Sequence, residues 1–168
     1  MSEKSVNETV SFGERLASSQ AFADLFCDGM KLVEETAAYL DGPGRLESKK
    51  LERNGALAYA TESMRLTTRL MQLASWLLLH RAVKEGEMSL AQASKEKAKV
   101  KLSVGEHNDE QNIKLLPERL RKLIQRSKAL HSAVRRVDAT IHAPPMPADR
   151  GNPVGHQLGL LKAAFERD

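Results

Sequence analysis

Few residues of this chain could do chemistry, and they are spread along its length. Cys27 is the only cysteine, so it cannot form an internal disulfide. His131 and His142 are eleven residues apart, which is three turns of helix and too far to share a metal ion. The histidines show no spacing typical of zinc or haem ligands: His80, His107, His131, His142 and His156. The sequence therefore predicts no metal and no other cofactor.

Catalytic patterns are also missing from the sequence. It contains neither a Walker-type phosphate-binding loop nor the glycine-rich turn of a dinucleotide-binding fold. Glu34 and Glu35 are adjacent, but neighbouring positions on a helix point about 100° apart and do not form an acid–base pair. We therefore expect a protein that is not an enzyme.

Residues 47–85 dominate the chain. They contain no proline, and only Gly55 interrupts a string of good helix formers. They predict one unbroken helix, roughly 58 Å long at 1.5 Å per residue. Its apolar residues form two neighbouring stripes: Leu57, Ala60, Met64, Met71, Ala74, Leu78 and Ala82 on one, and Tyr59, Leu66, Leu70, Leu73 and Leu77 on the other. The two stripes together cover a wide part of the helix surface, which indicates a helix that packs against neighbours on two sides. These neighbours belong to its own chain or to a second copy of it.

Trp76 lies on the helical wheel away from both stripes. Either a third helix of the chain covers it, or it anchors a contact with a partner or a second subunit, as Trp and Arg often do. We favour the second interpretation and expect a homodimer. The candidate contact residues are Arg65, Arg69, Gln72, Trp76, Leu79 and Val83.

Two more helices are expected beside the long one. An apolar stripe from Phe22 to Leu40 predicts the first, with Ser18 or Ser19 as N-cap and a stop at residues 41–44. The pattern places Cys27 beside Phe26, so we expect a packed or half-packed thiol. The short connection to the long helix predicts that these two helices lie antiparallel.

The third helix is expected to follow Pro117, a residue common in the first turn of helices. Its apolar seam is Leu120, Leu123, Ser127, Leu130, Val134, Val137 and Ile141, with Ile124 alongside. In the connection at 86–115, Ser89 can cap a short helix that runs to about Lys99. With only 4% aromatic residues, the sequence predicts an all-α, antiparallel three-helix bundle with one long central helix.

Charge is distributed unevenly along the chain. Residues 1–42 hold eight acids and three bases, whereas residues 114–142 hold eight bases and two acids. The basic face of the third helix comprises Arg119, Arg121, Lys122, Arg126, Lys128, Arg135 and Arg136. We favour a face that is solvated or paired with the acidic first helix, because no helix-turn-helix signature or stacking aromatics accompany it. A nucleic-acid-binding regulator that uses this third helix is the alternative.

The ends of the chain are expected to lie outside the bundle. We divide the chain into a mobile arm at 1–17, a three-helix domain at 18–142 and a disordered tail at 143–168. In the tail, Leu158, Leu161 and Phe165 could line a short docking helix, or belong to a plain tail. The arm lacks the apolar run of a secretory signal, and no apolar run could span a membrane. We expect a cytoplasmic protein.

Three segments together resemble a known family: residues 29–45 (GMKLVEETAAYLDGPGR), 56–93 (ALAYATESMRLTTRLMQLASWLLLHRAVKEGEMSLAQA) and 117–138 (PERLRKLIQRSKALHSAVRRVD). They are similar to the alphaproteobacterial family named for the regulator of CtrA degradation, much of which carries only a domain-of-unknown-function label. The resemblance covers roughly residues 20–140. It implies a three-helix bundle that forms a homodimer and has a mobile C-terminal tail.

The resemblance also implies a function. Members of the family act as adaptors in cell-cycle proteolysis: they join the ClpXP protease, primed by the response regulator CpdR, and tether cargo to it. Cargo includes transcription factors, and CtrA itself through the cyclic-di-GMP effector PopA. No family motif aligns with residues 1–17 or 143–168, so no residue is carried over as a protease or cargo contact.

Overall fold

The computed structural model describes residues 19–99 and 110–143 of the chain. In these two ranges the secondary structure consists of six helices and no strand, which confirms the prediction of an all-α fold. None of the helices in the described ranges has the length and apolar character needed to cross a membrane.

The first described helix, α2, spans Gln20–Asp41. The Ser19 hydroxyl accepts a hydrogen bond from the backbone N–H of Phe22 at 3.4 Å, as predicted for an N-cap. The buried residues of α2 are Phe22, Gly29, Leu32, Thr36 and Tyr39. Cys27 is exposed, so the expectation of a packed thiol was wrong: the helix turns its Leu32 and Tyr39 side inward and leaves Cys27 outside.

The long helix is shorter than predicted. Residues 47–85 do not form one rod: a short helix, α3 (Pro43–Ser48), comes first, and α4 (Arg53–Lys84) begins after a turn. The turn between the two helices lets α3 pack against both α2 and α4. At Gly44 a Cβ atom would lie 2.5 Å from Tyr59 Oη and 2.7 Å from the backbone oxygen of Tyr39. Glycine therefore allows α3 to fold tightly against the ends of α2 and α4, which helix propensity alone does not reveal.

A hydrogen bond also holds this corner. Tyr39 Oη donates to Glu47 Oε2 at 2.6 Å. The guanidinium of Arg119, at the start of the last helix, lies over the Tyr39 ring, 5.3 Å from its centroid. Burial, followed by the hydrogen bond to the Glu47 carboxylate, raises the pKa of Tyr39 well above its usual value.

The raised pKa of Tyr39 predicts a loss of stability at alkaline pH. The fold favours the neutral phenol, so the stabilisation is fully present below about pH 10, where tyrosine ionises in unfolded chains, and is lost as pH rises toward the folded pKa. We expect a Tyr59→Phe protein, which retains Tyr39 as its one tyrosine, to show no tyrosinate absorbance near pH 10 while folded. An ordinary titration near pH 10 in that folded variant would contradict the environment described for Tyr39.

The rest of the chain forms α5 (Leu90–Lys99), α6 (Glu110–Lys114) and α7 (Glu118–Ile141). Helix α5 begins where the sequence predicts, because Ser89 and Gln92 cap each other reciprocally: Gln92 N–H donates to Ser89 Oγ at 3.2 Å, and Ser89 N–H donates to Gln92 Oε1 at 3.0 Å. Pro117 precedes α7 as expected. The single turn of α6 was not predicted.

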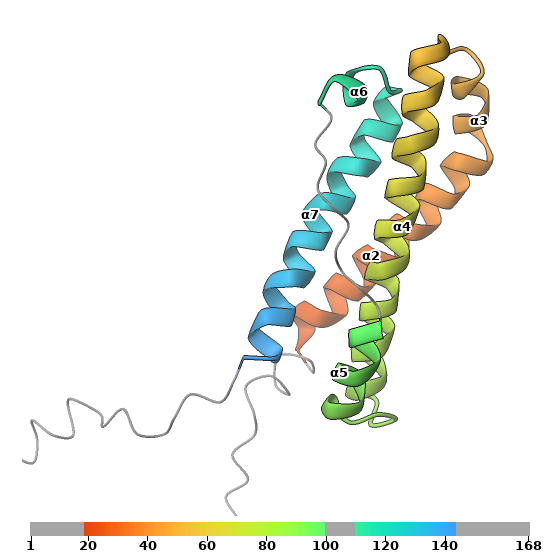
Figure 1. The fold of residues 1–168 in the computed structure, drawn as a ribbon. Helices are drawn as coiled ribbons and strands as arrows, with labels where there is room; N and C mark the ends of the chain where they lie inside the picture. Colours follow the sequence, from red (N-terminus) through yellow and green to blue (C-terminus); the bar gives the residue numbers. More distant parts are fainter. Residues whose placement is uncertain (1–18, 100–109, 144–168) are drawn as a thin grey trace, which may run out of the picture.

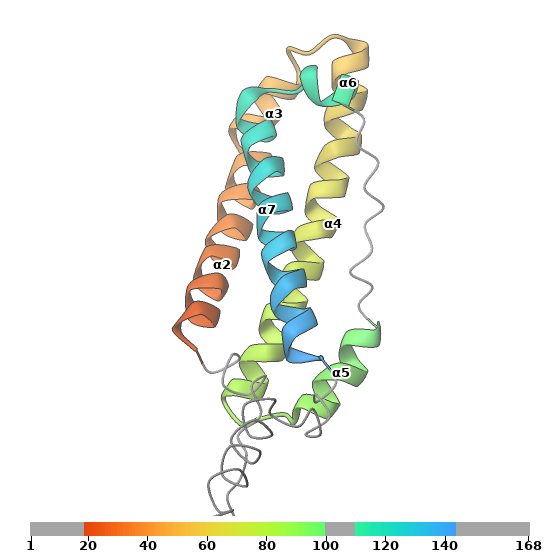
Figure 2. The ribbon, with the colours of Figure 1, turned by 90° about the vertical axis from the view of Figure 1, so that its left-hand side faces the viewer.

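Three long helices, α2, α4 and α7, lie side by side (Figures 1 and 2). Helix α2 runs antiparallel to α4, as predicted. Helix α7 runs in the same direction as α4: Gly55 at the start of α4 lies near Leu115, just before α7, and Trp76 in the second half of α4 bonds Asp138 near the end of α7. An all-antiparallel arrangement was therefore wrong. The long connection between α4 and α7 allows the parallel course of these two helices, because it begins with α5 at one end of the three long helices and finishes with α6 at the other end (Figure 2).

The core fills the space between these three helices. Helix α4 contributes one continuous buried face, and α7 contributes the seam that the sequence predicts, with Leu120, Leu123 and Val134 fully or almost fully buried. At Gly29 a Cβ atom would lie 2.4 Å from Leu77 Cδ1, so this glycine allows α2 to approach α4 closely. The residues of α4 that line the core are Ala58, Leu66, Leu70, Leu73, Trp76 and Leu77.

Candidate protein-interaction surfaces

An apolar stripe on α4 faces away from the core. Leu57, Met64, Met71 and Leu78 follow one another at intervals of seven residues, and their exposed fractions are 69%, 72%, 66% and 53%. A spacing of seven keeps side chains on one side of a helix over several turns. These residues make up most of one of the two stripes that the sequence predicts, and the neighbouring stripe, from Leu66 to Leu77, is buried. One predicted stripe is therefore buried and most of the other is exposed, and the contact of the exposed stripe with a second copy stays a prediction.

A groove runs beside the exposed stripe, between α2 and α4. Its volume is about 300 Å³. Met71 belongs to both the stripe and the groove wall, so the two features form one apolar surface. The other residues that line the groove are Val33, Thr36, Ala37, Leu40, Asp41, Thr67, Leu70 and Ala74. Apolar concavities of this kind suit the side chains of another protein.

Trp76 occupies a different place from the one expected. It is 1% exposed, because α7 covers it, and its Nε1–H donates to Asp138 Oδ1 of that helix at 2.8 Å. Its ring stacks on His80 at a centroid distance of 4.0 Å and lies 6.1 Å from the ring of Phe22. Cover by a third helix, the alternative considered above, is what the structure shows. The Trp76 side chain does not reach the surface of the described chain.

The other predicted contact residues divide into two groups. Arg69 is also buried, and its Nη1 donates to Ser127 Oγ of α7 at 2.9 Å. The remaining four, Arg65, Gln72, Leu79 and Val83, are half-buried, and their contact with a partner stays a prediction. The sequence places Trp76 and Arg69 on one side of the helical wheel, away from both apolar stripes, and this combination of residues is typical of an interface. The wheel does not show that α7 packs on this side of α4.

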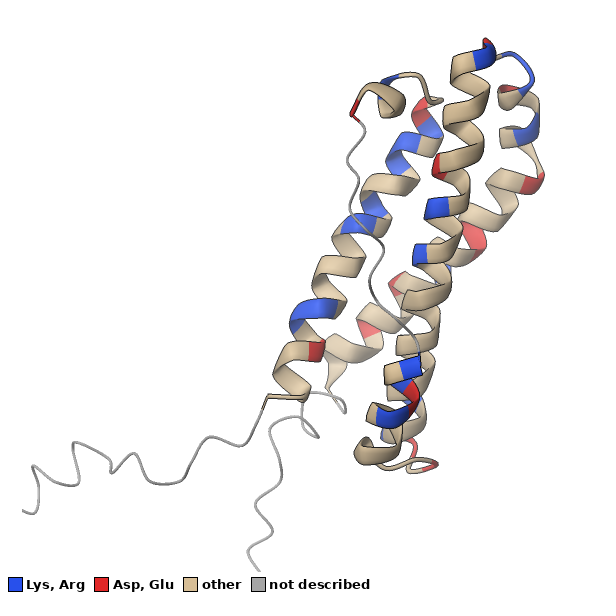
Figure 3. Ribbon diagram, in the orientation of Figure 1, with Lys and Arg blue, Asp and Glu red and all other residues tan. Residues whose placement is uncertain are grey.

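The basic face of α7 is partly neutralised within the chain. Arg126 Nη1 lies 2.5 Å from Glu35 Oε2 of α2, and Lys122 lies 2.8 Å from Glu118. Figure 3 shows basic positions along α7 and acidic positions on α2. Pairing with the acidic first helix, the interpretation favoured above, therefore holds for Arg126, and Arg119 stacks on Tyr39. Arg121, Arg135 and Arg136 are exposed, and Lys128 is half-buried.

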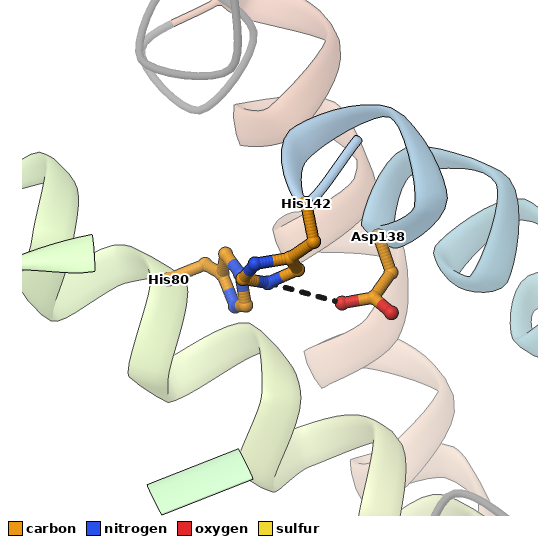
Figure 4. A group of neighbouring side chains, drawn as sticks. All are labelled: His80, Asp138 and His142. Carbon is orange, nitrogen blue, oxygen red and sulfur yellow. Dashed lines mark ion pairs between the residues drawn. The ribbon is translucent and has the colours of Figure 1, made fainter. Parts of the chain in front are cut away.

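One polar cluster was missed by sequence reasoning. His80 of α4 and His142, at the end of α7, stand 62 positions apart, yet their ring centroids are 5.7 Å apart (Figure 4). Asp138 lies one turn before His142, and its Oδ1 is 3.4 Å from His142 Nε2. The statement that the histidines do not cluster was wrong for this pair. A separation so long in sequence carries no spacing signal, and only the parallel course of α4 and α7 brings the two rings together.

The predicted arm at 1–17 and the tail beyond Ala143 lie outside the described residues, and so do the tail docking candidates Leu158, Leu161 and Phe165. The proposed roles of these segments therefore rest on the sequence alone.

The described helices define an all-α protein in which they leave exposed an apolar face of the kind used to bind other proteins. The chain belongs to the family described as "Protein of unknown function (DUF1465)", whose model matches residues 13–165. It is similar to RcdA from Caulobacter crescentus CB15, whose crystal structure matches with 49% sequence identity and a TM-score of 0.64, over 79% of this chain and 99% of RcdA. No curated protein matches the chain. RcdA is the regulator of CtrA degradation, so the resemblance to the family named for that regulator is confirmed.

Proposed function

We propose that this protein is a non-enzymatic adaptor that regulates the degradation of cell-cycle proteins, CtrA among them. The 49% identity to RcdA, over nearly the whole RcdA chain, is the observation that carries the proposal. The proposed partners are those of the family: the ClpXP protease with the response regulator CpdR, cargo proteins and the cyclic-di-GMP effector PopA. The proposed location is the cytoplasm, where these partners act.

An adaptor of this kind works through effective concentration. Holding cargo beside the protease makes a rare encounter intramolecular, so the rate of degradation rises without any catalytic group in the adaptor. The helices supply a rigid platform with an apolar stripe and groove on one side, and residues beyond 143 supply a tether. No nucleic-acid function is proposed, because no specific observation favours it and the basic face is paired in part with α2.

We further propose that the adaptor is a homodimer with the α4 stripe at its centre. Leu57, Met64, Met71 and Leu78 are large and exposed, whereas Ala60 and Thr67, on the same helix, are small. Large side chains of one copy can enter the spaces above small side chains of the other, as in coiled coils. A twofold axis across α4 would pack the stripe of one protomer against the same stripe of the other protomer, which is the self-complementary arrangement of most homodimers.

A reconstituted degradation assay tests the adaptor function. We expect the full chain to shorten the half-life of cargo in the presence of ClpXP and CpdR. Deletion of residues 144–168 is expected to abolish the acceleration while leaving helicity and self-association unchanged, because the described helices end before that point. Circular dichroism and light scattering check these two properties.

A second variant separates a docking peptide from a plain tether. Leu158→Ser/Leu161→Ser/Phe165→Ser keeps the length of the tail and removes its apolar residues. If these side chains dock on a partner, this variant will fail like the deletion, and if the tail only links, the variant will remain active. The adaptor proposal fails if the full chain leaves the half-life of every tested cargo unchanged.

A further inference from the structure

The cluster at the end of α4 and α7 combines three side chains that bind metal ions in other proteins. His80 comes from α4, Asp138 comes from the last turn of α7, and His142, four residues later, is the residue that caps this helix (Figure 4). One nitrogen or oxygen atom from each of the three lies within 4.8 Å of those of the other two. Residues at i and i+4 of a helix are a common source of paired ligands, since they point to the same side.

The hydrogen bonds of the cluster leave the two imidazoles ready to coordinate. His80 Nδ1 is 2.9 Å from the carbonyl oxygen of Trp76, and a carbonyl only accepts, so Nδ1 carries the proton. Nε2 of His80 therefore holds a lone pair. This atom is buried and makes no hydrogen bond among the described residues. A histidine held through one ring nitrogen by a backbone carbonyl, with the other nitrogen directed at a cation, is the usual arrangement of metal ligands.

His142 is held in a similar way. Its Nδ1 lies 3.2 Å from the hydroxyl oxygen of Ser94 on α5, and Nε2 is buried without a hydrogen bond. The Ser94 hydroxyl can accept from Nδ1–H or donate to Nδ1. When it accepts, the lone pair of Nε2 faces Asp138 Oδ1 at 3.4 Å, and a cation bound between the two atoms would replace their repulsion by attraction.

Burial makes the unmatched nitrogen of His80 significant. The His80 side chain is 0% exposed, so water cannot satisfy Nε2 from outside. A buried polar atom without a partner destabilises a fold by about 1–3 kcal/mol, and most buried polar atoms in proteins are paired. A ligand for this atom would remove the penalty. The side chains of Asp138 and His142 are 16% and 22% exposed, so the cluster opens to solvent on its α7 side.

We propose that His80 Nε2, His142 Nε2 and Asp138 Oδ1 bind a zinc ion, with water at the fourth position. Two imidazoles and one carboxylate are a frequent ligand set for zinc, whereas Mg²⁺ and Ca²⁺ prefer sites made of oxygen atoms alone. Ligand atoms around tetrahedral zinc stand about 3.3 Å apart, so the three groups close in by roughly 1.5 Å at most from their present positions. Asp138 Oδ1 already accepts a hydrogen bond from Trp76 Nε1–H at 2.8 Å, so the adjustment is expected mainly at His142, on the exposed side of the cluster.

Lys97 of α5 competes for the same carboxylate. Its ammonium pairs with Asp138 Oδ2 in the structure, so a cation already neutralises this carboxylate. Zinc bound at Oδ1 would repel that ammonium and weaken its pairing with Asp138. Since Ser94 and Lys97 both belong to α5, binding of the ion would also change how α5 rests on α7. The site therefore links zinc to the position of a surface helix.

Zinc titration of the chelator-treated full chain tests this proposal. We expect one zinc ion per chain by calorimetry, a higher melting temperature in its presence, and the intense visible absorption of four-coordinate Co²⁺ when cobalt replaces zinc. His142→Gln, at a half-exposed helix end, is expected to weaken zinc binding at least about tenfold without unfolding the chain. Lys97→Gln is expected to strengthen it severalfold, because it removes the competing ammonium.

His131→Gln is the matched control, since it removes a described histidine of α7 that does not belong to the cluster and should leave zinc affinity unchanged. The proposal is overturned if the folded chain binds no zinc, or if His142→Gln and the control bind it equally well. Cobalt spectra that show only weak six-coordinate bands would overturn it too. These outcomes are independent of the adaptor function, which the degradation assay measures separately.

Discussion

Replacement of Trp76 by alanine is expected to lower the free energy of unfolding by about 3–5 kcal/mol. The ring is 1% exposed and contacts three helices: Phe22 of α2, His80 of its own helix and Asp138 of α7. Its removal leaves a cavity between these elements and deprives Asp138 Oδ1 of a hydrogen bond. Because single domains are stable by only about 5–15 kcal/mol, the loss would be a large part of the total.

Urea denaturation followed by circular dichroism measures this loss, since Trp76 is the one tryptophan of the chain and fluorescence disappears with it. Trp76→Phe separates the contribution of packing from that of the hydrogen bond to Asp138. Phenylalanine fills most of the cavity but has no N–H donor, so we expect the free energy of unfolding to fall by about 1–3 kcal/mol. Leu46→Ala, at a position 64% exposed on α3, is the surface control, with an expected change within about 0.5 kcal/mol. A Trp76→Ala protein as stable as this control would contradict the buried position.

The sequence predicts helices well here because their signals are local. Ser19, Ser89 and Pro117 each stand beside the helix end that they mark, and capping chemistry needs only a few neighbouring residues. The apolar seam of α7 is likewise written in steps of three and four residues, and Leu120, Leu123 and Val134 are buried as that pattern requires.

Features that depend on contacts between distant segments were not predictable in this way. The break between α3 and α4 lets α3 pack with Gly44 fitted against Tyr39 and Tyr59, and helix propensity does not register such a fit. The direction of α7 depends on where a long connection delivers the chain. Once α7 is parallel to α4, it covers Trp76 and joins His80 to His142.

The same reasoning explains why the candidate interface moved on α4. Two apolar stripes on one helix look equivalent in a sequence, and the neighbours decide which of them is buried. Helices α2 and α7 cover the stripe that contains Leu66 and Leu77, together with Trp76. The stripe from Leu57 to Leu78 is left outside. The apolar face of α4 that is left exposed is a different face from the one around Trp76, and its contact with a partner stays a prediction.

Charge in the exposed stripe is expected to separate the proposed dimer. In a Met64→Lys/Met71→Lys protein, association would bury ammonium groups in an apolar contact, and a twofold axis would bring the charges of the two copies together. We expect the dissociation constant of the dimer to rise at least about 100-fold, equivalent to about 2.7 kcal/mol. The fold should persist, because both methionines are 66–72% exposed in the single chain. Sedimentation over a range of concentrations measures the change.

A Ser132→Lys/Ala139→Lys protein, with lysines at two exposed positions of α7, adds the same two positive charges away from the stripe and serves as the control for net charge. It should sediment as the unchanged protein does, because only charges placed on the shared face oppose association. If the unchanged protein is monomeric at every concentration, or if the double variant associates as strongly, α4 does not mediate a homodimer. The exposed methionines would then be available to bind cargo or the protease. The degradation assay with the double variant tests this role: if the protein is monomeric with and without the two lysines, and the lysines abolish the acceleration of cargo degradation, the stripe binds another protein and not a second copy of this chain.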